Sequence, residues 1–322
     1  MDRMPSQANQ PLPDGYVLMN YRIDGVLSRG GFSIVYLAQD ENGLPVAIKE
    51  YLPSQLALRN EGDALPSIKE EHAAAFQYGM RCFFEEGRSL ALLSHTNLVR
   101  VLDFFRANET AYIVMRYERG RTLHEHMRAH RGPLRETFLR HVFAQLMNGL
   151  REVHRNRLLH LDIKPANILI TRSGYAKLAD FGLAKVHEPS TPDAGHPSQR
   201  FSGAGAIVGT VGYMSPEQAL GQPVDARSDI YSAGCVLYEL LTGRPPFNGE
   251  TPVSIAYQHV NEPPKVPSSL DASISPTLDA IALHALNKHP GQRYQTAAEM
   301  RADVERAIAG MPIAAPLTEG AR

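Results

Sequence analysis

A short polar run, His160 to Asn167, contains residue types that could do chemistry together. It places a carboxylate (Asp162), an ammonium group (Lys164) and an amide (Asn167) at fixed offsets. Pro165 disfavours a continuous helix through the run. Apolar residues precede and follow it, namely Leu158, Leu159, Ile168, Leu169 and Ile170. We therefore expect a shaped loop that is held between buried elements.

A second acidic motif, Asp180-Phe181-Gly182, follows the strand-like residues 176–179. Taken alone, Asp162 or Asp180 would more often be a carboxylate that caps a turn. Two carboxylates and an amide on adjoining turns, however, form the oxygen-rich kind of cluster that Mg²⁺ prefers, usually shared with phosphate oxygens of a substrate. The two motifs therefore predict a magnesium site that serves phosphate chemistry.

The first half of the chain predicts an antiparallel sheet with one principal helix. Strand-like stretches, several of them joined by glycine-containing turns, occupy residues 21–27, 34–38, 46–49, 99–105 and 111–117. Apolar residues at spacings of three and four predict an amphipathic helix over residues 73–93. Residues 53–72 lack a clear period, and we interpret them as a polar insertion, most simply a surface loop.

The second half is mainly helical in pattern, over residues 134–154, 229–242, 254–260, 278–287 and 297–309. The predicted fold class is α+β, with a small, mainly antiparallel β lobe that is followed by a larger, mainly α lobe. The expected organisation has four parts: a disordered N-terminal tail (1–15), the first lobe (16–117), the second lobe (118–308) and a C-terminal tail (309–322).

Composition excludes several classes of function. The 322 residues are 43% hydrophobic and 21% charged, and the formal net charge of -1 gives no overall field that would attract nucleic acid or an anionic membrane. The sequence has no signal-peptide pattern at its start and no run of about 18 apolar residues. Its two cysteines, Cys82 and Cys235, suit a reducing compartment. We expect a cytoplasmic protein without a membrane span.

Two further motifs complete a family signature. Val46-Ala47-Ile48-Lys49 lies upstream of the polar run and Ser215-Pro216-Glu217 lies downstream. With these motifs in order, the chain resembles the eukaryotic-type protein serine/threonine kinases, in the branch found in bacteria, over residues 16–308. The resemblance implies a two-lobed protein-kinase-like fold that transfers the γ-phosphoryl group of ATP to Ser and Thr hydroxyls of proteins, including its own.

The resemblance also implies roles for the polar loop. Asp162 would orient the hydroxyl group of the substrate and accept its proton late in the transfer, and Lys164 would contact the γ-phosphate. Asn167 and Asp180 would ligate Mg²⁺, with Mn²⁺ as a second candidate. A Lys two positions after the Asp is typical of Ser/Thr kinases rather than tyrosine kinases. The segment from Gly209 to Glu217 agrees, with the Thr210 hydroxyl expected near Asp162.

The nucleotide would be held by residues of both lobes. Lys49 would bind the α- and β-phosphates, and Glu86, rather than Glu85, would fix its position through an ion pair. Met115 would be the gatekeeper, and backbone groups of Arg116 and Glu118 would bind the edge of the purine. The full set of implied nucleotide contacts is Leu27, Gly30, Gly31, Val35, Ala47, Lys49, Met115, Arg116, Glu118 and Leu169.

Other matched positions are expected to be structural. Asp229 resembles the buried helix carboxylate that braces the backbone of the catalytic loop. Arg293 resembles the partner of Glu217 in a buried ion pair. For His160, a hydrogen-bonded core histidine is preferred over a general base, and Phe181 is expected to pack behind the site.

The glycine loop departs from the family pattern. Where the pattern has three glycines, this chain has Ser28-Arg29-Gly30-Gly31-Phe32-Ser33, so that Ser28 and Ser33 replace the first and the third. Side chains at these places restrict the backbone and keep it further from phosphate. We therefore expect weakened or selective nucleotide binding.

The catalytic loop also departs from the pattern, because position 161 is Leu where kinases that are regulated by phosphorylation of the activation loop have Arg. A phosphate on residues 183–208 then lacks its usual cationic partner. That segment offers four acceptors, Ser190, Thr191, Ser198 and Ser202. We expect that their phosphorylation does not switch activity.

Three hypotheses about function remain open from the sequence. The leading hypothesis is an active protein kinase that acts on Ser and Thr of protein substrates. A pseudokinase, acting as a nucleotide-binding or scaffold module, is supported by the irregular glycine loop. A small-molecule kinase on a related fold is disfavoured by Ser215-Pro216-Glu217, which looks like part of a peptide-docking platform. Dimerisation is compatible with the sequence, but no feature of it indicates a dimer.

Overall fold

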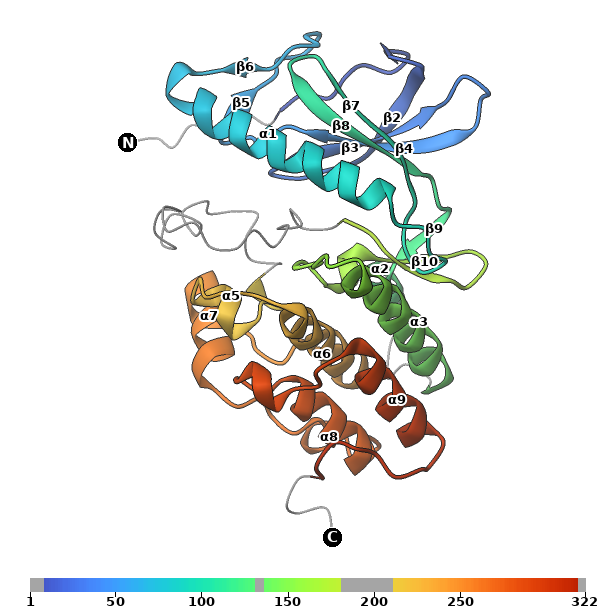
Figure 1. The fold of residues 1–322 in the computed structure, drawn as a ribbon, viewed down its shortest axis with the longest axis vertical. Coiled ribbons are helices and arrows are strands. Elements are labelled where there is room, and N and C mark those ends of the chain that lie inside the picture. Colours follow the sequence, from blue (N-terminus) through green and yellow to red (C-terminus); the bar gives the residue numbers. More distant parts are fainter. Residues whose placement is uncertain (1–8, 131–135, 181–210, 318–322) are drawn as a thin grey trace. The chain divides into compact units, whose positions relative to one another are not determined.

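The computed structural model describes residues 9–130, 136–180 and 211–317 (Figure 1). The chain divides into two compact units. The first contains residues 1–94 and 99–118, and the second contains residues 95–98 and 119–322. Among the described residues, every helix is too short or too polar to cross a lipid bilayer.

The first unit is built on a six-stranded antiparallel sheet with the strand order β1-β2-β3-β4-β8-β7. Its strands are β1 (Val17–Leu18), β2 (Tyr21–Arg29), β3 (Ser33–Gln39), β4 (Pro45–Tyr51), β7 (Val101–Ala107) and β8 (Thr110–Arg116). Between β7 and β8, Asn108 and Glu109 both have positive φ, as a two-residue hairpin turn of type I′ requires. The five predicted strands are all present. β2, β3 and β4 are longer than predicted, whereas β7 begins two residues later than predicted and β8 is shifted by one residue toward the N-terminus.

One principal helix, α1 (Glu70–Ala91), packs against β7 and β8 (Figure 1). It begins three residues before the predicted start, and its first turn carries Glu70 and Glu71, whose charges suit the positive end of a helix dipole. Gly87 allows a close approach to the sheet, because a Cβ atom there would lie 2.9 Å from a side-chain carbon of Ile113. The spacing of apolar residues located this helix correctly but not its first turn.

The prediction that residues 1–15 are disordered is wrong for residues 9–12. Asn9 donates through Nδ2 to the carbonyl of Leu52 and accepts at Oδ1 from the backbone N–H of Arg59. Leu12 is buried, and its N–H donates to the hydroxyl of Tyr36. These partners belong to the sheet and to the segment after β4, so long-range hydrogen bonds that no local pattern encodes order this part of the chain.

The interpretation of residues 53–72 as a simple surface loop is also wrong. The segment contains a short hairpin of β5 (Ala57–Leu58) and β6 (Ser67–Ile68). Its Arg59 is fully buried and forms an ion pair with Glu50 of β4, with 2.6 Å between Nη1 and Oε1. The hydroxyls of Tyr36 and Tyr112 donate to the same carboxylate. The segment therefore contributes to the core of the first unit.

The second unit is mainly helical. Within the described residues its α-helices are α2 (Leu123–Ala129), α3 (Glu136–Arg155), α5 (Pro216–Ala219), α6 (Ala226–Thr242), α7 (Pro252–Asn261), α8 (Pro276–Ala285) and α9 (Ala297–Ile308). Most side chains of α6 are buried, so this helix forms the centre of the unit. Asp225 caps its first turn, and Gly243, with a φ of 74°, ends it in the left-handed conformation that glycine favours.

A small sheet of β9 (Gly120–Thr122), β10 (Ile168–Thr171) and β11 (Ala176–Leu178) completes the second unit, with β10 in the middle. A 3₁₀ helix, Pro165–Asn167, leads directly into β10. Residues 311–317 follow α9, and Asp303 accepts hydrogen bonds from the backbone N–H groups of Ala314 and Ala315. An antiparallel β unit with one principal helix and a larger, mainly α unit confirm the predicted α+β fold class.

Candidate active site

The backbone of the polar loop is held by one buried carboxylate from α6. Asp229 is fully buried, and it accepts hydrogen bonds from the N–H groups of His160 (2.9 Å) and Leu161 (2.7 Å). Nε2 of His154, on α3, lies 2.8 Å from the same carboxylate. The predicted brace is confirmed, and His154 is a partner that sequence reasoning missed.

Asp229 is ionised in this environment. Burial opposes its charge, but the hydrogen bond and charge of His154 and the backbone N–H of His160 outweigh burial and hold the pKa of the carboxyl below its usual range. A charged acceptor makes stronger hydrogen bonds than a neutral one. The loop backbone is therefore fixed by charge-assisted bonds.

Leu161 has a left-handed backbone with a φ of 58°, a conformation that is uncommon outside glycine. Such a residue persists where surrounding contacts determine its backbone. Besides the bond from its N–H to Asp229, its carbonyl accepts a hydrogen bond of 3.0 Å from Nε2 of Gln218. Both backbone polar groups of Leu161 are thus held by side chains from elsewhere in the second unit.

His160 is fully buried, as predicted for a core histidine. The N–H of Asp162 points to its Nδ1 at 3.3 Å, so Nδ1 is an acceptor and the ring proton is on Nε2. Nε2 then donates to the carbonyl of Ala179 at 3.2 Å. Burial lowers the pKa of this imidazole and keeps it neutral. His160 therefore connects the backbone of Asp162 to the residue that precedes Asp180.

The three polar side chains of the loop lie together. Nζ of Lys164 is 2.8 Å from Oδ2 and 3.0 Å from Oδ1 of Asp162. Nδ2 of Asn167 is 2.8 Å from the same Oδ2 and also donates to the backbone carbonyl of Asp162 at 2.9 Å. The side chains of Asp162 and Lys164 are each 19% exposed, so the carboxylate is fixed and can still be reached from solvent.

Asp180 is joined to this cluster through backbone groups. Nδ2 of Asn167 lies 3.2 Å from the carbonyl of Asp180, and the N–H of Ala179 donates to the carbonyl of Asn167 at 2.9 Å. Because the amide nitrogen of Asn167 faces these oxygens, its own side-chain oxygen faces away from them. Phe181, Thr210 and the four hydroxyl acceptors between residues 183 and 208 lie outside the described residues.

The donor set fits a hard divalent cation that is shared with phosphate. An amide oxygen of Asn167 and a carboxylate of Asp180 are oxygen ligands of the kind that Mg²⁺ prefers. Within the described residues there is no group of three or more His, Cys, Asp or Glu side chains that could bind a metal by itself. Two protein ligands match a cation whose other ligands come from a nucleotide and water.

In the first unit, strand register brings the predicted nucleotide residues to one face of the sheet. Val35 pairs with Lys49 between β3 and β4, and Ala47 pairs with Met115 between β4 and β8. Directly paired residues share a face, as do residues two apart on one strand. Val35, Ala47, Lys49 and Met115 therefore form one surface of the first unit. The predicted contact Leu169 belongs to β10 in the second unit.

Lys49 reaches the face of α1 that carries Glu86. Its Nζ lies 5.9 Å from the ring centre of Phe83, which is three residues before Glu86 and on the same helix face. Glu86 is almost fully buried, and a buried carboxylate needs a charged or hydrogen-bonded partner. The ion pair between Lys49 and Glu86 stays a prediction, and this environment suits it.

The structure limits how the backbone of Arg116 could bind a nucleotide. The N–H of Arg116 donates to the carbonyl of Arg100 at 2.9 Å, so only its carbonyl group remains as the predicted contact.

The glycine loop has an ordinary backbone. Neither Gly30 nor Gly31 has a positive φ, and Ser33 is part of β3. The loop is also tied to the segment after Lys49, because the N–H of Ser54 donates to the carbonyl of Gly31.

The predicted ion pair between Glu217 and Arg293 is confirmed. The two guanidinium nitrogens lie 2.7 and 2.9 Å from the two carboxylate oxygens, and both side chains are buried. Burial opposes the charge of Glu217, but its bonds to Arg293 and Ser228 lower the pKa of the carboxyl overall. This pair anchors the segment that precedes and forms α5.

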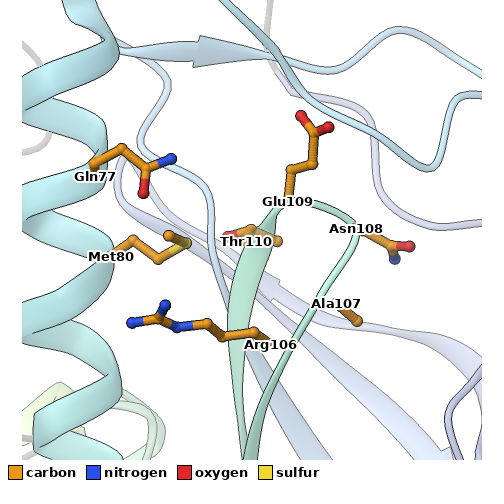
Figure 2. Close-up of a pocket in the computed structure, with 7 residues that line it drawn as sticks. All are labelled: Gln77, Met80, Arg106, Ala107, Asn108, Glu109 and Thr110. Carbon is orange, nitrogen blue, oxygen red and sulfur yellow. The ribbon is translucent and has the colours of Figure 1, made fainter.

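A cavity of about 340 Å³ lies elsewhere in the first unit, between α1 and the turn from β7 to β8 (Figure 2). Gln77 and Met80 line it from α1, and residues 106–110 line it from the hairpin. None of its lining residues is a predicted nucleotide contact. The cavity is therefore not the predicted nucleotide site.

Sequence reasoning missed residues whose partners are distant in the chain. Asn97 accepts at its carbonyl from the N–H of Leu178 and donates through Nδ2 to the carbonyl of Ala176, so it aligns the strand before Asp180. Gln218 and Arg59 also bond to distant backbone or side chains. A polar residue inside an apolar or motif-bearing stretch could have indicated Asn97 and Gln218, whereas Arg59 lies in a polar stretch that gives no such signal.

Comparison with known proteins agrees with this geometry. The model of the protein kinase domain family matches residues 21–303, so the chain belongs to this family. A probable serine/threonine-protein kinase of Streptomyces coelicolor is 41% identical over 306 residues, which cover 94% of this chain and 42% of that protein. The serine/threonine-protein kinase PknB of Mycobacterium leprae is 40% identical over 301 residues, or 92% of this chain and 44% of that protein.

Among solved structures, the chain is similar to one titled "PpkA-294 apo form", with a TM-score of 0.74 and 31% identity. The match covers 91% of this chain and 99% of that one. The chain spans less than half the length of the curated relatives named above. These matches confirm the predicted membership of the eukaryotic-type kinase family in its bacterial branch.

Proposed function

We propose that the chain is an ATP-dependent protein serine/threonine kinase that transfers the γ-phosphoryl group to Ser and Thr hydroxyls of proteins, including its own. One observation carries the proposal: the carboxylate of Asp162 is fixed by Lys164 and Asn167 on a loop whose backbone Asp229 holds. This is the arrangement that positions an acceptor hydroxyl beside a transferring phosphoryl group. The names of the related proteins support the same activity.

The residues of the chain would act mainly by position and charge. Asp162 would accept a hydrogen bond from the acceptor hydroxyl, orient it and take its proton late in the transfer. Lys164 would move from the carboxylate of Asp162 toward the γ-phosphate, and Lys49 would bind the α- and β-phosphates. When bound by Asn167 and Asp180, Mg²⁺ or Mn²⁺ would neutralise charge on the phosphate oxygens.

The glycine loop gives little support to the pseudokinase reading. The expected penalty for Ser28 and Ser33 was a restricted backbone, but both residues lie within β-strands and none of residues 28–33 has a positive φ. Serine adopts a strand backbone without strain. The two serines are therefore compatible with nucleotide binding, and the kinase reading is favoured.

The test is phosphoryl transfer by the purified protein. With Mg²⁺, radiolabelled ATP and dephosphorylated casein, we expect label on Ser and Thr residues of casein. Asp162→Asn should lower the rate at least about 1,000-fold, because the acceptor hydroxyl loses the group that orients it and accepts its proton. The circular dichroism spectrum of the variant should match that of the wild type. Undiminished transfer by Asp162→Asn, or no transfer by the wild type under these conditions, would refute the proposed function.

A further inference from the structure

We propose that Gln218 is a positioning residue for Asp162: its amide holds the peptide group between Leu161 and Asp162 in the orientation that catalysis needs. The proposal rests on the proposed kinase function. It concerns a side chain of α5 that donates a hydrogen bond to the catalytic loop. Its bonds are all formed within the second unit.

The peptide group between Leu161 and Asp162 is held at both ends. Its carbonyl accepts from Nε2 of Gln218 at 3.0 Å, and its N–H points to Nδ1 of His160 at 3.3 Å. The preceding two N–H groups are bound by Asp229. Three side chains therefore fix the backbone on the amino side of Asp162, and Gln218 is the one that contacts the carbonyl.

The left-handed conformation of Leu161 makes this contact important. A leucine at a φ of 58° is held there by its surroundings and gains nothing from its own side chain. Without a donor at the carbonyl, the peptide group could rotate toward a more common conformation. This peptide group contains the backbone nitrogen of Asp162. Its rotation would therefore move the carboxylate of Asp162 relative to Lys164 and Asn167.

The side-chain oxygen of Gln218 makes hydrogen bonds to a different residue, Ser215. Oε1 accepts from the N–H of Ser215 at 3.0 Å and from its hydroxyl at 3.1 Å, while the N–H of Gln218 donates to the same hydroxyl. This is a capping box at the start of α5. A glutamate would serve the capping box at least as well, because its charge suits the helix N-terminus. The amide nitrogen is the part that only glutamine supplies, and it is the part that contacts Leu161.

Because the nitrogen and the oxygen of Gln218 bind different residues, two substitutions can separate their effects. Gln218→Glu keeps an acceptor for Ser215 but removes the donor to Leu161, and it places a carboxylate next to a carbonyl oxygen. Gln218→Met removes both functions at nearly the same volume. A structural role in capping predicts that only the Met variant loses stability and activity. A positioning role predicts that both variants lose turnover.

The matched control is Gln295→Glu. Gln295 is an exposed glutamine of the second unit, and its Nε2 donates to the carbonyl of Arg293 at 2.7 Å, so the substitution removes the same kind of bond away from the loop. Its Oε1 acceptor, which binds Arg227, is retained. We expect the turnover of this variant to stay within about twofold of the wild type.

The experiment measures kcat and KM for ATP and for casein in the four proteins, together with their melting temperatures. We expect kcat to fall about tenfold in both Gln218 variants, as the loss of one well-placed hydrogen bond implies, with both KM values within about twofold. The melting temperature of Gln218→Glu should fall less than that of Gln218→Met, because only the Met variant also loses the capping box. A kcat of Gln218→Glu within twofold of the wild type, an effect on KM alone, or an equal loss in Gln295→Glu would overturn the inference.

A second measurement does not depend on activity. Hydrogen exchange of the backbone N–H of Asp162, followed in the folded protein, should be faster in Gln218→Glu than in the wild type and in Gln295→Glu, because the peptide group is freer to rotate. Unchanged exchange would overturn the inference even if the wild type showed no transfer. A wild-type protein that transfers no label would instead refute the proposed function, so the two failures can be told apart.

Discussion

Each unit contains a fully buried carboxylate: Glu50 follows Lys49 in the first unit, and Asp229 bonds to the catalytic loop in the second. The two carboxylates have different kinds of hydrogen-bond partners. Glu50 directly follows Lys49 on β4, and its partners are side chains, namely Arg59, Tyr36 and Tyr112. Asp229 holds the catalytic loop, and its partners are mainly the backbone N–H groups of His160 and Leu161. Glu50 therefore ties elements of the sheet to one another, whereas Asp229 sets the shape of a loop.

The difference follows from how each unit positions its functional side chains. In the first unit, strand register alone places Val35, Ala47 and Lys49 on one face, so buried polar groups are needed only to complete the core. In the second unit, Asp162 lies on a loop without a repeating backbone pattern, and side chains must fix that backbone one group at a time. We expect loss of the Glu50 partner to affect mainly stability and loss of Asp229 to affect mainly turnover.

The largest expected effect is on stability in the first unit. Arg59→Met should lower the free energy of unfolding by about 3–5 kcal/mol, because it leaves the carboxylate of Glu50 buried without its opposite charge. Chemical denaturation measures this change. At a temperature where the variant is folded, its kcat should stay within about threefold of the wild type, since no partner of Glu50 belongs to the catalytic loop.

The double variant Glu50→Gln/Arg59→Met is the control for the origin of this effect. Replacing both members of a buried ion pair often restores much of the stability that the single substitution removes. Most of the loss should therefore be recovered in the double variant. If Arg59→Met were as stable as the wild type, water or other groups would compensate the charge of Glu50. Side-chain partners would then not be what stabilises the buried carboxylate of the first unit.

The next effect is on turnover in the second unit. Asp229→Asn keeps one acceptor oxygen but turns an NH₂ group toward a backbone N–H, so one of the bonds to His160 and Leu161 is lost and the other loses its charge. We expect kcat to fall about 100-fold, which corresponds to about 2.7 kcal/mol of lost transition-state stabilisation. Steady-state kinetics on protein whose fold is confirmed by circular dichroism measures it. A turnover equal to that of the wild type would mean that Gln218 and His160 hold the loop without Asp229.

The sequence predicted those features that depend on local pattern or on motifs. Five of the six strands of the sheet, α1, the polar loop and the brace from Asp229 were expected, because alternation, helical spacing and motif order encode them; the two-residue strand β1 was not. It could not predict the order of residues 9–12 or the burial of Arg59, since both depend on partners many positions away. The bond from Gln218 to Leu161 was invisible for the same reason. Long-range hydrogen bonds between polar side chains and backbone leave no periodic signal.

A third buried ionisable group, His259, has a charge of its own sign nearby instead of an opposite charge. His259 on α7 is fully buried, with Nδ1 2.9 Å from the hydroxyl of Tyr231. Burial, followed by the nearby positive charge of Lys288, lowers the pKa of the imidazole to about 3. Where Glu50 and Asp229 have partners that stabilise charge, His259 is kept neutral in the folded protein.

The expected effect of His259 is the smallest of the series and depends on pH. Its pKa in the unfolded chain is near 6.5, so below that pH the unfolded state binds a proton that the folded state excludes. The free energy of unfolding should therefore fall as pH decreases, by about 2 kcal/mol between pH 7 and pH 5 from this group. Denaturation at the two pH values should show this much less loss in His259→Gln than in the wild type. Equal losses in the two proteins would show that His259 accepts a proton in the folded state, and that burial without an opposite charge is less costly in this unit than the contrast with Asp229 implies.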